Sequence, residues 1–255
     1  MNLDTDLVSN IRINLSAIER RTSTLTKTRS VKKEYQAAWL LKAISLIDLT
    51  TLSGDDTAGK VERLCEKAKR PISLDLLHQL GLQQGDIQVG AVCVYHHLIK
   101  EAKKNLPKNI PVAAVSTGFP AGLSSFKTRK LEITESIKNG ADEIDIVIIR
   151  GFVLQNNWKK LYEEVADFKK AAKNKHIKAI LGVGDLETLR NVAKASMVCM
   201  MAGADFIKTS TGKESINANL NNSLVMLRMI RHFYQMTGKK TVSYTHLTLP
   251  TTPYV

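Results

Sequence analysis

The sequence predicts an α/β protein built as a TIM (β/α)8 barrel that is incomplete here, with about six of the eight βα units and an N-terminal helical extension. Short β-rich runs alternate with longer amphipathic runs, and the β-rich runs are nearly continuous in apolar residues, as in a parallel sheet covered on both faces. A doubly wound sheet shares this pattern but needs nucleotide loops. Gly182-x-Gly184 lacks the third glycine of such a loop, and Ile207 stands where a P-loop before Gly212-Lys213 needs glycine. The barrel is therefore favoured.

The elements follow in order along the chain. Each expected strand is a short apolar run, and each expected helix has apolar residues at helical spacing. The strands cover residues 43–52, 88–95, 111–116, 143–149, 177–183 and 205–210, and the helices cover 61–70, 97–106, 126–140, 158–174, 186–203 and 221–238. Gly140, Gly203 and Gly238 each follow a helical run, where a left-handed C-cap is expected.

Three segments are expected. Residues 1–40 lack period-two runs and form a helical N-terminal extension, and residues 41–241 form the incomplete barrel. Residues 242–255, VSYTHLTLPTTPYV, are rich in Thr, Pro and Tyr and have no strand or helix period after TVSYTHL. We expect this tail to be disordered or a sequence artefact at a truncated or chimeric C-terminus.

Charge and cysteine content limit which partners and which cellular compartment we expect. The 37 Lys and Arg against 24 Asp and Glu give a net charge of +13, which suits a nucleic acid or a sugar phosphate. The basic residues are dispersed without a nucleic-acid motif, so a small sugar phosphate is expected rather than nucleic acid. Cys65, Cys93 and Cys199 show no CxxC spacing, and no apolar run reaches membrane-spanning length. We expect a cytoplasmic protein without a metal site or membrane partner.

Polar residues inside apolar strands mark the candidate chemistry. By strand parity, Asp48, Asp145 and Lys208 can all face the barrel interior near the C-terminal ends of their strands, where active sites of this fold lie. Desolvation lowers the pKa of a buried lysine in general and frees an amine that can attack a carbonyl. Lys208 could therefore form an imine. It could equally form a structural ion pair with Asp145 or Asp48, or extend its amine to the strand end.

The loop after residues 205–210 reads TSTGKES. Thr211, Gly212 and Lys213 could hold a phosphate with backbone N–H groups and a cation, although an ordinary strand-to-helix turn explains the same residues. Further glycine-containing turns, GFPAG and GDLETL, are expected at the same end of the barrel.

Six collinear motifs then carry a family resemblance. LIDLTTLSGDDT, AVCVY, GFPAG, EIDIVI, LGVGDL and above all DFIKTSTGKE resemble the deoxyribose-phosphate aldolases, which are class I aldolases. The resemblance implies reversible cleavage of 2-deoxy-D-ribose 5-phosphate to D-glyceraldehyde 3-phosphate and acetaldehyde in deoxyribonucleotide catabolism, without a cofactor. It makes Lys208 the Schiff-base lysine and Asp145 part of the proton relay.

The same resemblance assigns substrate-binding residues. It places Thr211, Gly212 and Lys213 at the phosphate or beside it, and it places Asp48 and Thr50 in the substrate pocket. Lys178 matches a lysine of the family and is expected to point inward, and Cys93 lines the pocket or packs in the core. The assignments of Asp48, Thr50, Lys178 and the phosphate residues are expectations drawn from the family, whereas those of Cys93 and of a homo-oligomer do not rest on it.

The chain also departs from the family. Nothing in it matches the motif KPAGGIR, which carries a second lysine and phosphate-binding glycines, and the eighth strand is missing. His96 and Val183 replace a proline and a threonine that are usual in the family. We therefore expect the gene to encode the aldolase and this chain to be inactive or impaired. The alternatives are an inactive fragment, a barrel that only binds a sugar phosphate, and a different class I aldolase.

Overall fold

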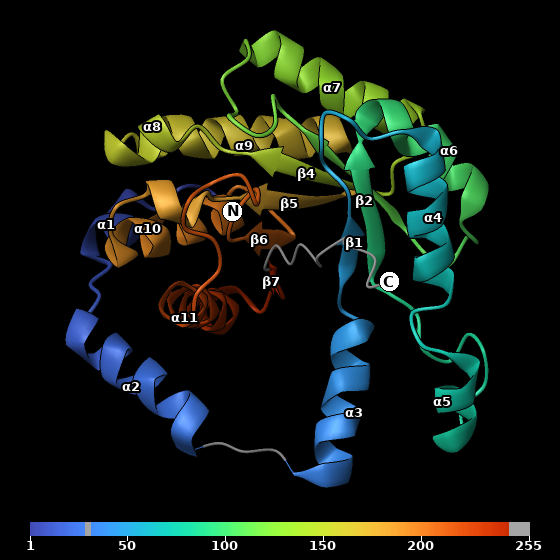
Figure 1. Ribbon diagram of the computed structural model, residues 1–255. Coiled ribbons are helices and arrows are strands. Elements are labelled where there is room, and N and C mark those ends of the chain that lie inside the picture. The colour runs from blue at the N-terminus through green and yellow to red at the C-terminus, as the bar shows by residue number, and fades with distance from the viewer. Residues whose placement is uncertain (29–31, 245–255) are drawn as a thin grey trace. The chain divides into compact units, whose positions relative to one another are not determined.

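The computed structural model describes residues 1–28 and 32–244 and divides the chain into two compact units (Figure 1). Of the described residues, the first unit comprises 1–28, 116–134 and 144–244, and the second comprises 32–115 and 135–143. Each unit is built from parallel strands and the helices that connect them.

The second unit holds the first three strands. Its elements are α3 (Lys33–Ile44), β1 (Asp48–Thr50), α4 (Ala58–Lys69), α5 (Leu74–Gln79), β2 (Ala91–Tyr95), η1 (His96–Leu98), α6 (Ile99–Asn105) and β3 (Val112–Ser116), the last residue of which belongs to the first unit. The strands pair in parallel, with Thr50 beside Cys93 and Cys93 beside Ala113. Helices α4 and α6 pack on β2 and bury Cys65 and Ile99 there. Asp142 closes this unit by accepting hydrogen bonds from Lys103 Nζ (2.9 Å) and the Val112 N–H (3.0 Å).

The first unit holds the remaining strands. Its elements are α1 (Thr5–Asn10), α2 (Leu15–Thr28), most of α7 (Phe126–Lys138), β4 (Glu143–Val147), α8 (Arg150–Leu154), α9 (Trp158–Ala172), β5 (His176–Ile180), η2 (Val183–Asp185), α10 (Leu189–Met201), β6 (Phe206–Lys208), α11 (Leu220–Thr237) and β7 (Val242–Tyr244). β5, β6 and β7 pair in parallel, with Lys178 beside Phe206 and Phe206 beside Val242. Helix α9 packs on β5, and α10 packs on β6 and on α11.

These observations confirm the predicted fold class. Parallel strands alternate with helices and follow one another in chain order within each unit, which is the arrangement of a (β/α) barrel. The described residues form seven strands, so the barrel is incomplete. The left-handed C-caps are confirmed as well, since Gly140, Gly203 and Gly238 all have positive φ angles. The division at residues 40 and 241 stays a prediction. Residues 242–244 of the expected tail form strand β7 beside β6 and are therefore ordered, and residues 245–255 lie outside the described part of the chain.

Some boundaries differ from the sequence prediction. The strand expected over residues 43–52 begins only at Asp48, because the helix-forming run KEYQAAWLLKAI continues α3 to Ile44. Two short helices, α5 and α8, were not predicted. Each has six residues or fewer, which is too short for an apolar period to appear in the sequence.

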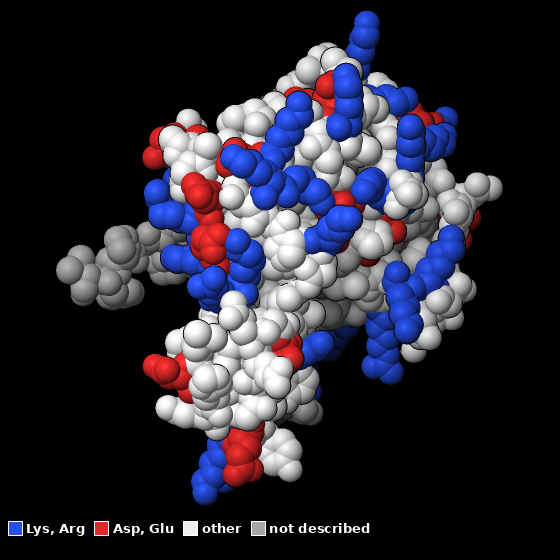
Figure 2. Space-filling model, turned by 90° about the vertical axis from the view of Figure 1, so that its right-hand side faces the viewer, with Lys and Arg blue, Asp and Glu red and all other residues white. Residues whose placement is uncertain are grey.

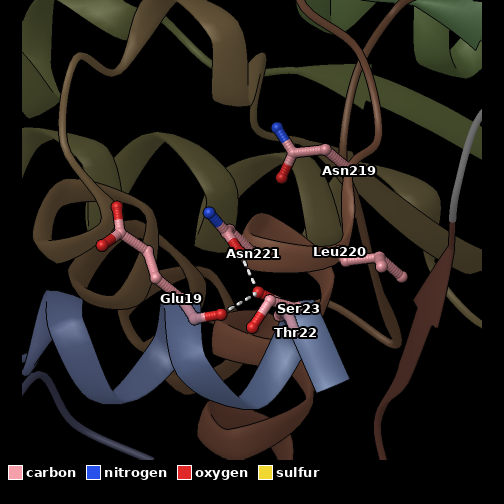
Figure 3. Close-up of a pocket in the computed structure, with 6 residues that line it drawn as sticks. All are labelled: Glu19, Thr22, Ser23, Asn219, Leu220 and Asn221. Atoms are coloured by element: carbon pink, nitrogen blue, oxygen red, sulfur yellow. Dashed lines mark hydrogen bonds between the residues drawn. The ribbon is translucent and has the colours of Figure 1, made fainter. Parts of the chain in front are cut away.

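Helix α2 of the N-terminal region packs against α11 within the first unit (Figure 3). The hydroxyl of Thr22 donates to Asn221 Oδ1 (2.5 Å), and Asn219 caps α11 by accepting from the Asn222 N–H (2.9 Å). A hollow of about 610 Å³ lies between these helices and is lined by Glu19, Thr22, Ser23, Asn219, Leu220 and Asn221. The N-terminal helices are thus integrated into the packing of the first unit.

The surface carries dispersed charge. Figure 2 shows one face on which lysine and arginine side chains project among acidic and uncharged residues. Within residues 1–28 and 32–244, no helix is long and apolar enough to cross a membrane, and no group of three His, Cys, Asp or Glu side chains could hold a metal ion. All three cysteines are free thiols and are buried.

A buried ion pair ties α7 to α9 in the first unit. Arg129 and Glu164 contact each other with 2% and 6% of their side chains exposed. Arg129 Nε also donates to the Ser124 carbonyl (3.0 Å), and the guanidinium lies over the Phe168 ring, 5.2 Å from its centroid. The pair therefore anchors the loop that precedes α7.

We expect Arg129→Met to lower the free energy of unfolding by about 3–5 kcal/mol, because it leaves the carboxylate of Glu164 buried without its cation. The double variant Arg129→Met, Glu164→Leu removes both charges and should recover most of that loss. Urea denaturation of the wild type and both variants measures this difference. Equal stability of the single and double variants would contradict the account.

Candidate active site

The centre of the candidate site is a cluster of three buried charged side chains in the first unit. Lys208 ends β6, Asp145 lies in the middle of β4, and Lys178 lies in the middle of β5. Lys208 Nζ lies 2.7 Å from Asp145 Oδ2, and Lys178 Nζ lies 4.0 Å from Asp145 Oδ1. None of the three has more than 1% of its side chain exposed. The structure therefore brings together both predicted catalytic residues and one predicted binding residue.

Strand register explains why these side chains meet. In the parallel pair, Lys178 is beside Phe206 and Ile180 is beside Lys208, so the two lysines project from the same face of neighbouring strands. If both lysines were protonated, the three groups would carry one net positive charge in the interior. Burial disfavours that state, and a neutral amine is the form that attacks a carbonyl. The arrangement can therefore support amine chemistry.

The loop after β6 carries the predicted phosphate residues. Thr211 is buried, Gly212 has a φ of +83°, and Lys213 is exposed. The Lys213 N–H donates to Thr211 Oγ1 (3.1 Å), and the Thr211 hydroxyl and N–H both donate to the carboxylate of Glu214 (2.7 and 2.9 Å to Oε2). The donors of Thr211 are thus engaged within the loop, whereas Lys213 presents its ammonium to solvent.

The turn after β5 packs closely against this loop. Gly182 has a φ of +65°, and a side chain there would lie 3.1 Å from Arg150 Cδ and 3.3 Å from Glu214 Oε1. A side chain at Gly184 would overlap the carbonyl oxygen of Ile216. Gly182 and Gly184, which do not belong to a nucleotide-binding motif, therefore permit the close approach of the loops after β5 and β6.

Arg150 joins three connections at the C-terminal ends of the strands. Its Nη1 donates to the carbonyls of Pro120 (3.2 Å) and Ala121 (3.0 Å) in the GFPAG loop. Its Nε donates to Asp185 Oδ2 (3.2 Å) in the turn after β5, while its backbone begins α8 after β4. One guanidinium thus holds together the loops after β3, β4 and β5.

Thr117 links the loop after β3 to β4. Its hydroxyl accepts from the Val147 N–H (2.7 Å) and donates to the Val147 carbonyl (3.2 Å), and its side chain is fully buried. Its φ of +63° is an unusual conformation for a β-branched residue. These two hydrogen bonds stabilise the β4 backbone two residues beyond Asp145.

The second unit carries the other predicted binding residues. Asp48 and Thr50 lie two apart in β1, and Thr50 pairs with Cys93 of β2, so the three share one face of this pair of strands. Asp48 is 6% exposed and Cys93 is fully buried. Their role in substrate binding stays a prediction.

Asp56 organises the loop after β1. Its carboxylate accepts from the Thr51 hydroxyl (2.7 Å) and the Ser53 N–H (2.9 Å), and it pairs with Lys60 Nζ (2.7 Å). Burial acts to raise the pKa of Asp56, but the Lys60 ammonium and these two donors outweigh burial and hold the pKa below its ordinary value of 3.8. The charged form is therefore the one that stabilises this loop.

Comparison with known proteins identifies the family. A family model described as DeoC/LacD family aldolase matches residues 42–235, which is more than half of the chain. The chain belongs to the DeoC/LacD aldolase family. This DeoC/LacD aldolase is 52% identical to the deoxyribose-phosphate aldolase of Homo sapiens and 53% identical to that of Mus musculus, in each case over 93% of this chain and 76% of the relative.

Solved structures support the fold of this DeoC/LacD aldolase. The deoxyribose phosphate aldolase from Aeropyrum pernix, described as a tetramer, superposes with a TM-score of 0.62 at 20% sequence identity, covering 91% of this chain and 85% of the other. At that identity the likeness concerns the fold alone. It agrees with the parallel strands and connecting helices seen in each unit.

Sequence analysis of this DeoC/LacD aldolase missed the residues that hold its loops in place. Arg150 and Thr117 contact segments about 30 residues away in the sequence, so no local spacing signals them. Asp56 contacts residues within five positions of itself, in its own loop and in the first turn of α4. Glu214 did have a signal. Thr211-x-x-Glu214 matches the spacing of a capping box, in which the glutamate accepts from the N–H of the residue three positions earlier.

We expect Thr117→Val to lower the free energy of unfolding by about 1–3 kcal/mol, because both backbone groups of Val147 lose their partner in the interior. Thr117→Ser keeps the hydroxyl and should be nearly neutral. Urea denaturation compares them, and a valine variant as stable as the serine variant would refute the importance of these bonds.

The lowered pKa of Asp56 predicts a pH-dependent effect of Asp56→Asn. The contribution of the charged carboxylate is complete above its unfolded pKa and is lost as the pH falls through the lower folded pKa. The wild type should therefore be more stable than the variant at neutral pH, and the difference should shrink below about pH 4. Denaturation at several pH values tests this, with Asp55→Asn as the exposed control. A difference that does not change with pH would contradict the assignment.

Proposed function

We propose that this chain catalyses the reversible aldol cleavage of 2-deoxy-D-ribose 5-phosphate to D-glyceraldehyde 3-phosphate and acetaldehyde through an imine on Lys208, at an impaired rate because no KPAGGIR motif supplies the second lysine. The contact between the buried Lys208 amine and Asp145, 2.7 Å apart, carries the proposal. Identity of 52% to the human deoxyribose-phosphate aldolase over most of the chain supports it. We place this activity in cytoplasmic deoxyribonucleotide catabolism.

The chemistry follows from the amine. Lys208 Nζ attacks the C1 aldehyde of the open-chain sugar, and loss of water leaves a protonated imine. The imine withdraws electrons while the C2–C3 bond breaks, the C3 hydroxyl loses its proton, and D-glyceraldehyde 3-phosphate leaves. The remaining enamine takes a proton at C2, and water then hydrolyses the imine to release acetaldehyde and the free lysine. The protons that are removed during cleavage are returned during the reverse reaction, condensation.

Asp145 is the proposed proton carrier. Its carboxylate lies within hydrogen-bond distance of the nucleophile, so it can accept protons from the attacking amine and return them as water leaves. Lys178 lies on the other side of the same carboxylate. The Lys178 and Lys208 side chains thus share the carboxylate of Asp145.

The phosphate end is proposed to lie at the loop after β6. Lys213 is exposed and adjoins Gly212, whose backbone can approach a ligand closely because it has no side chain. Thr211, whose donors already bind Glu214, would act beside the phosphate by ordering this turn. Asp48, Thr50 and Cys93, which share one face of β1 and β2, are proposed as further substrate-binding residues.

The proposed partner is a small sugar phosphate. Neither a nucleic acid nor a membrane partner is part of the proposal. Self-association is proposed as well, because the Aeropyrum pernix relative is tetrameric, and light scattering on the purified chain checks it. The rival function is a barrel that binds a sugar phosphate without cleaving it.

Two substitutions test the assigned roles. Asp145→Asn should lower kcat by about 10²–10⁴-fold through loss of the proton carrier, yet acetaldehyde should still form an imine on Lys208. Lys208→Met should abolish both turnover and imine formation. Release of D-glyceraldehyde 3-phosphate measures turnover, and circular dichroism verifies folding.

Lys138→Met, on the exposed end of α7, is the matched control and should behave like the wild type. Turnover by Lys208→Met at the wild-type rate would refute the mechanism. Saturable binding of 2-deoxyribose 5-phosphate without any cleavage by the wild type would favour the rival function. Faster turnover of another sugar phosphate would identify a different class I aldolase.

A further inference from the structure

Glu214 occupies a central place in the loop after β6. Its carboxylate accepts three hydrogen bonds from Thr211: two from the N–H, at 2.9 and 3.2 Å, and one from the hydroxyl at 2.7 Å. Thr211 is 1% exposed and lies three residues after Lys208. The carboxylate thus binds the backbone close to the nucleophile.

The contacts form a directed chain. The Lys213 N–H donates to Thr211 Oγ1, and the hydroxyl proton of Thr211 points to Glu214 Oε2. Because a hydroxyl has one proton, its donation to Glu214 leaves the oxygen lone pairs to accept from Lys213. Glu214 therefore determines where the backbone of Lys213 lies.

The remainder of Glu214 is also held in place. Its carbonyl accepts from Asn217 Nδ2 (3.1 Å). Its Oε1 and the Arg150 side chain both approach the position that a Cβ at Gly182 would take, at 3.3 and 3.1 Å. The nearby guanidinium offsets part of the negative charge of the carboxylate. Glu214 is therefore fixed by the loop after β6 and by the turn after β5.

We propose that Glu214 is a positioning residue that sets the selectivity of this site for a phosphorylated sugar over its unphosphorylated counterpart. The inference rests on the proposed function and assigns a role to a residue outside the imine chemistry. The hydrogen bonds of Glu214 go to Thr211 and Asn217, and none goes to Lys208 or Asp145. It acts by holding Gly212 and Lys213 in the geometry that receives the phosphate.

A positioning role and a purely electrostatic role of Glu214 predict opposite changes in phosphate binding when its carboxylate is removed. A carboxylate near a phosphate repels it, so removing a negative charge with no positioning role would strengthen phosphate binding. Removing a positioning group would instead release the Thr211 hydroxyl and the Lys213 backbone and weaken binding. The direction of the change in KM therefore distinguishes the two roles.

The experiment compares Glu214→Ala, Glu214→Gln and the wild type on 2-deoxyribose 5-phosphate and on 2-deoxyribose. For Glu214→Ala we expect KM for the phosphorylated sugar to rise about tenfold or more, as for loss of a hydrogen bond to a charged group. The value of kcat/KM for 2-deoxyribose should change less than about twofold. Glu214→Gln keeps one acceptor oxygen and should restore part of the selectivity.

Two further measurements separate this inference from the proposed function. Acetaldehyde has no phosphate, so its trapping on Lys208 with borohydride should be equal in the wild type and Glu214→Ala. Binding of inorganic phosphate, followed by titration calorimetry, should weaken in Glu214→Ala and remain unchanged in Glu163→Ala, the control on the exposed face of α9.

The outcomes are distinct. An equal loss of activity on both sugars would show a purely structural role and overturn the inference, as would a lower KM for the phosphorylated sugar in either variant. Either result leaves the proposed function intact if acetaldehyde is still trapped on Lys208. Failure of the wild type to trap acetaldehyde would overturn the proposed function and this inference together.

Discussion

A lysine and an aspartate can share a protein interior only if the backbone presents both side chains at contact distance, since either charge alone would be strongly destabilised there. Lys208 and Asp145 meet this condition at 2.7 Å, with Lys178 on the other side of the carboxylate. The condition requires strand parity that places all three on one face and a register that aligns β5 with β6. A shift of one residue in either strand would point a lysine at the covering helices instead.

The loops at the C-terminal ends of these strands are built to keep the cluster in place. Arg150 joins the connections after β3, β4 and β5, and Thr117 holds the β4 backbone near Asp145. Gly184 allows the loop after β6 to approach the turn after β5. The hydrogen bonds of Thr117 are buried and lose little to competition from water, whereas those of Arg150 are exposed to solvent. The first unit therefore surrounds the buried amine of Lys208 with loops that side-chain hydrogen bonds hold together.

The sequence predicted the elements whose apolar residues recur at a regular spacing. Apolar alternation located the strands, and a charged residue inside an apolar strand singled out Asp145 and Lys208; their ion pair was one of the alternatives considered. The imine role and Lys178 came from family resemblance. Arg150 and Thr117 could not be predicted, because each acts across loops whose approach depends on the folded backbone. Asp56 acts within its own loop, which carries no apolar period from which its role could be predicted. The start of β1 was misplaced because helix-forming residues run on to Ile44, and only pairing with β2 limits the strand to three residues.

Lys208 is the lysine that we propose as the nucleophile, among all the lysines of the chain. The most direct measurement is to incubate the wild-type protein with acetaldehyde and borohydride, digest it, and map the modified lysine by mass spectrometry. Reduction converts the transient imine into a stable secondary amine, so the reacting residue stays labelled. One dominant ethyl adduct is expected, on the peptide that contains Lys208. An adduct on Lys178 or Lys213, or labelling spread over exposed lysines with Lys208 unmodified, would contradict it.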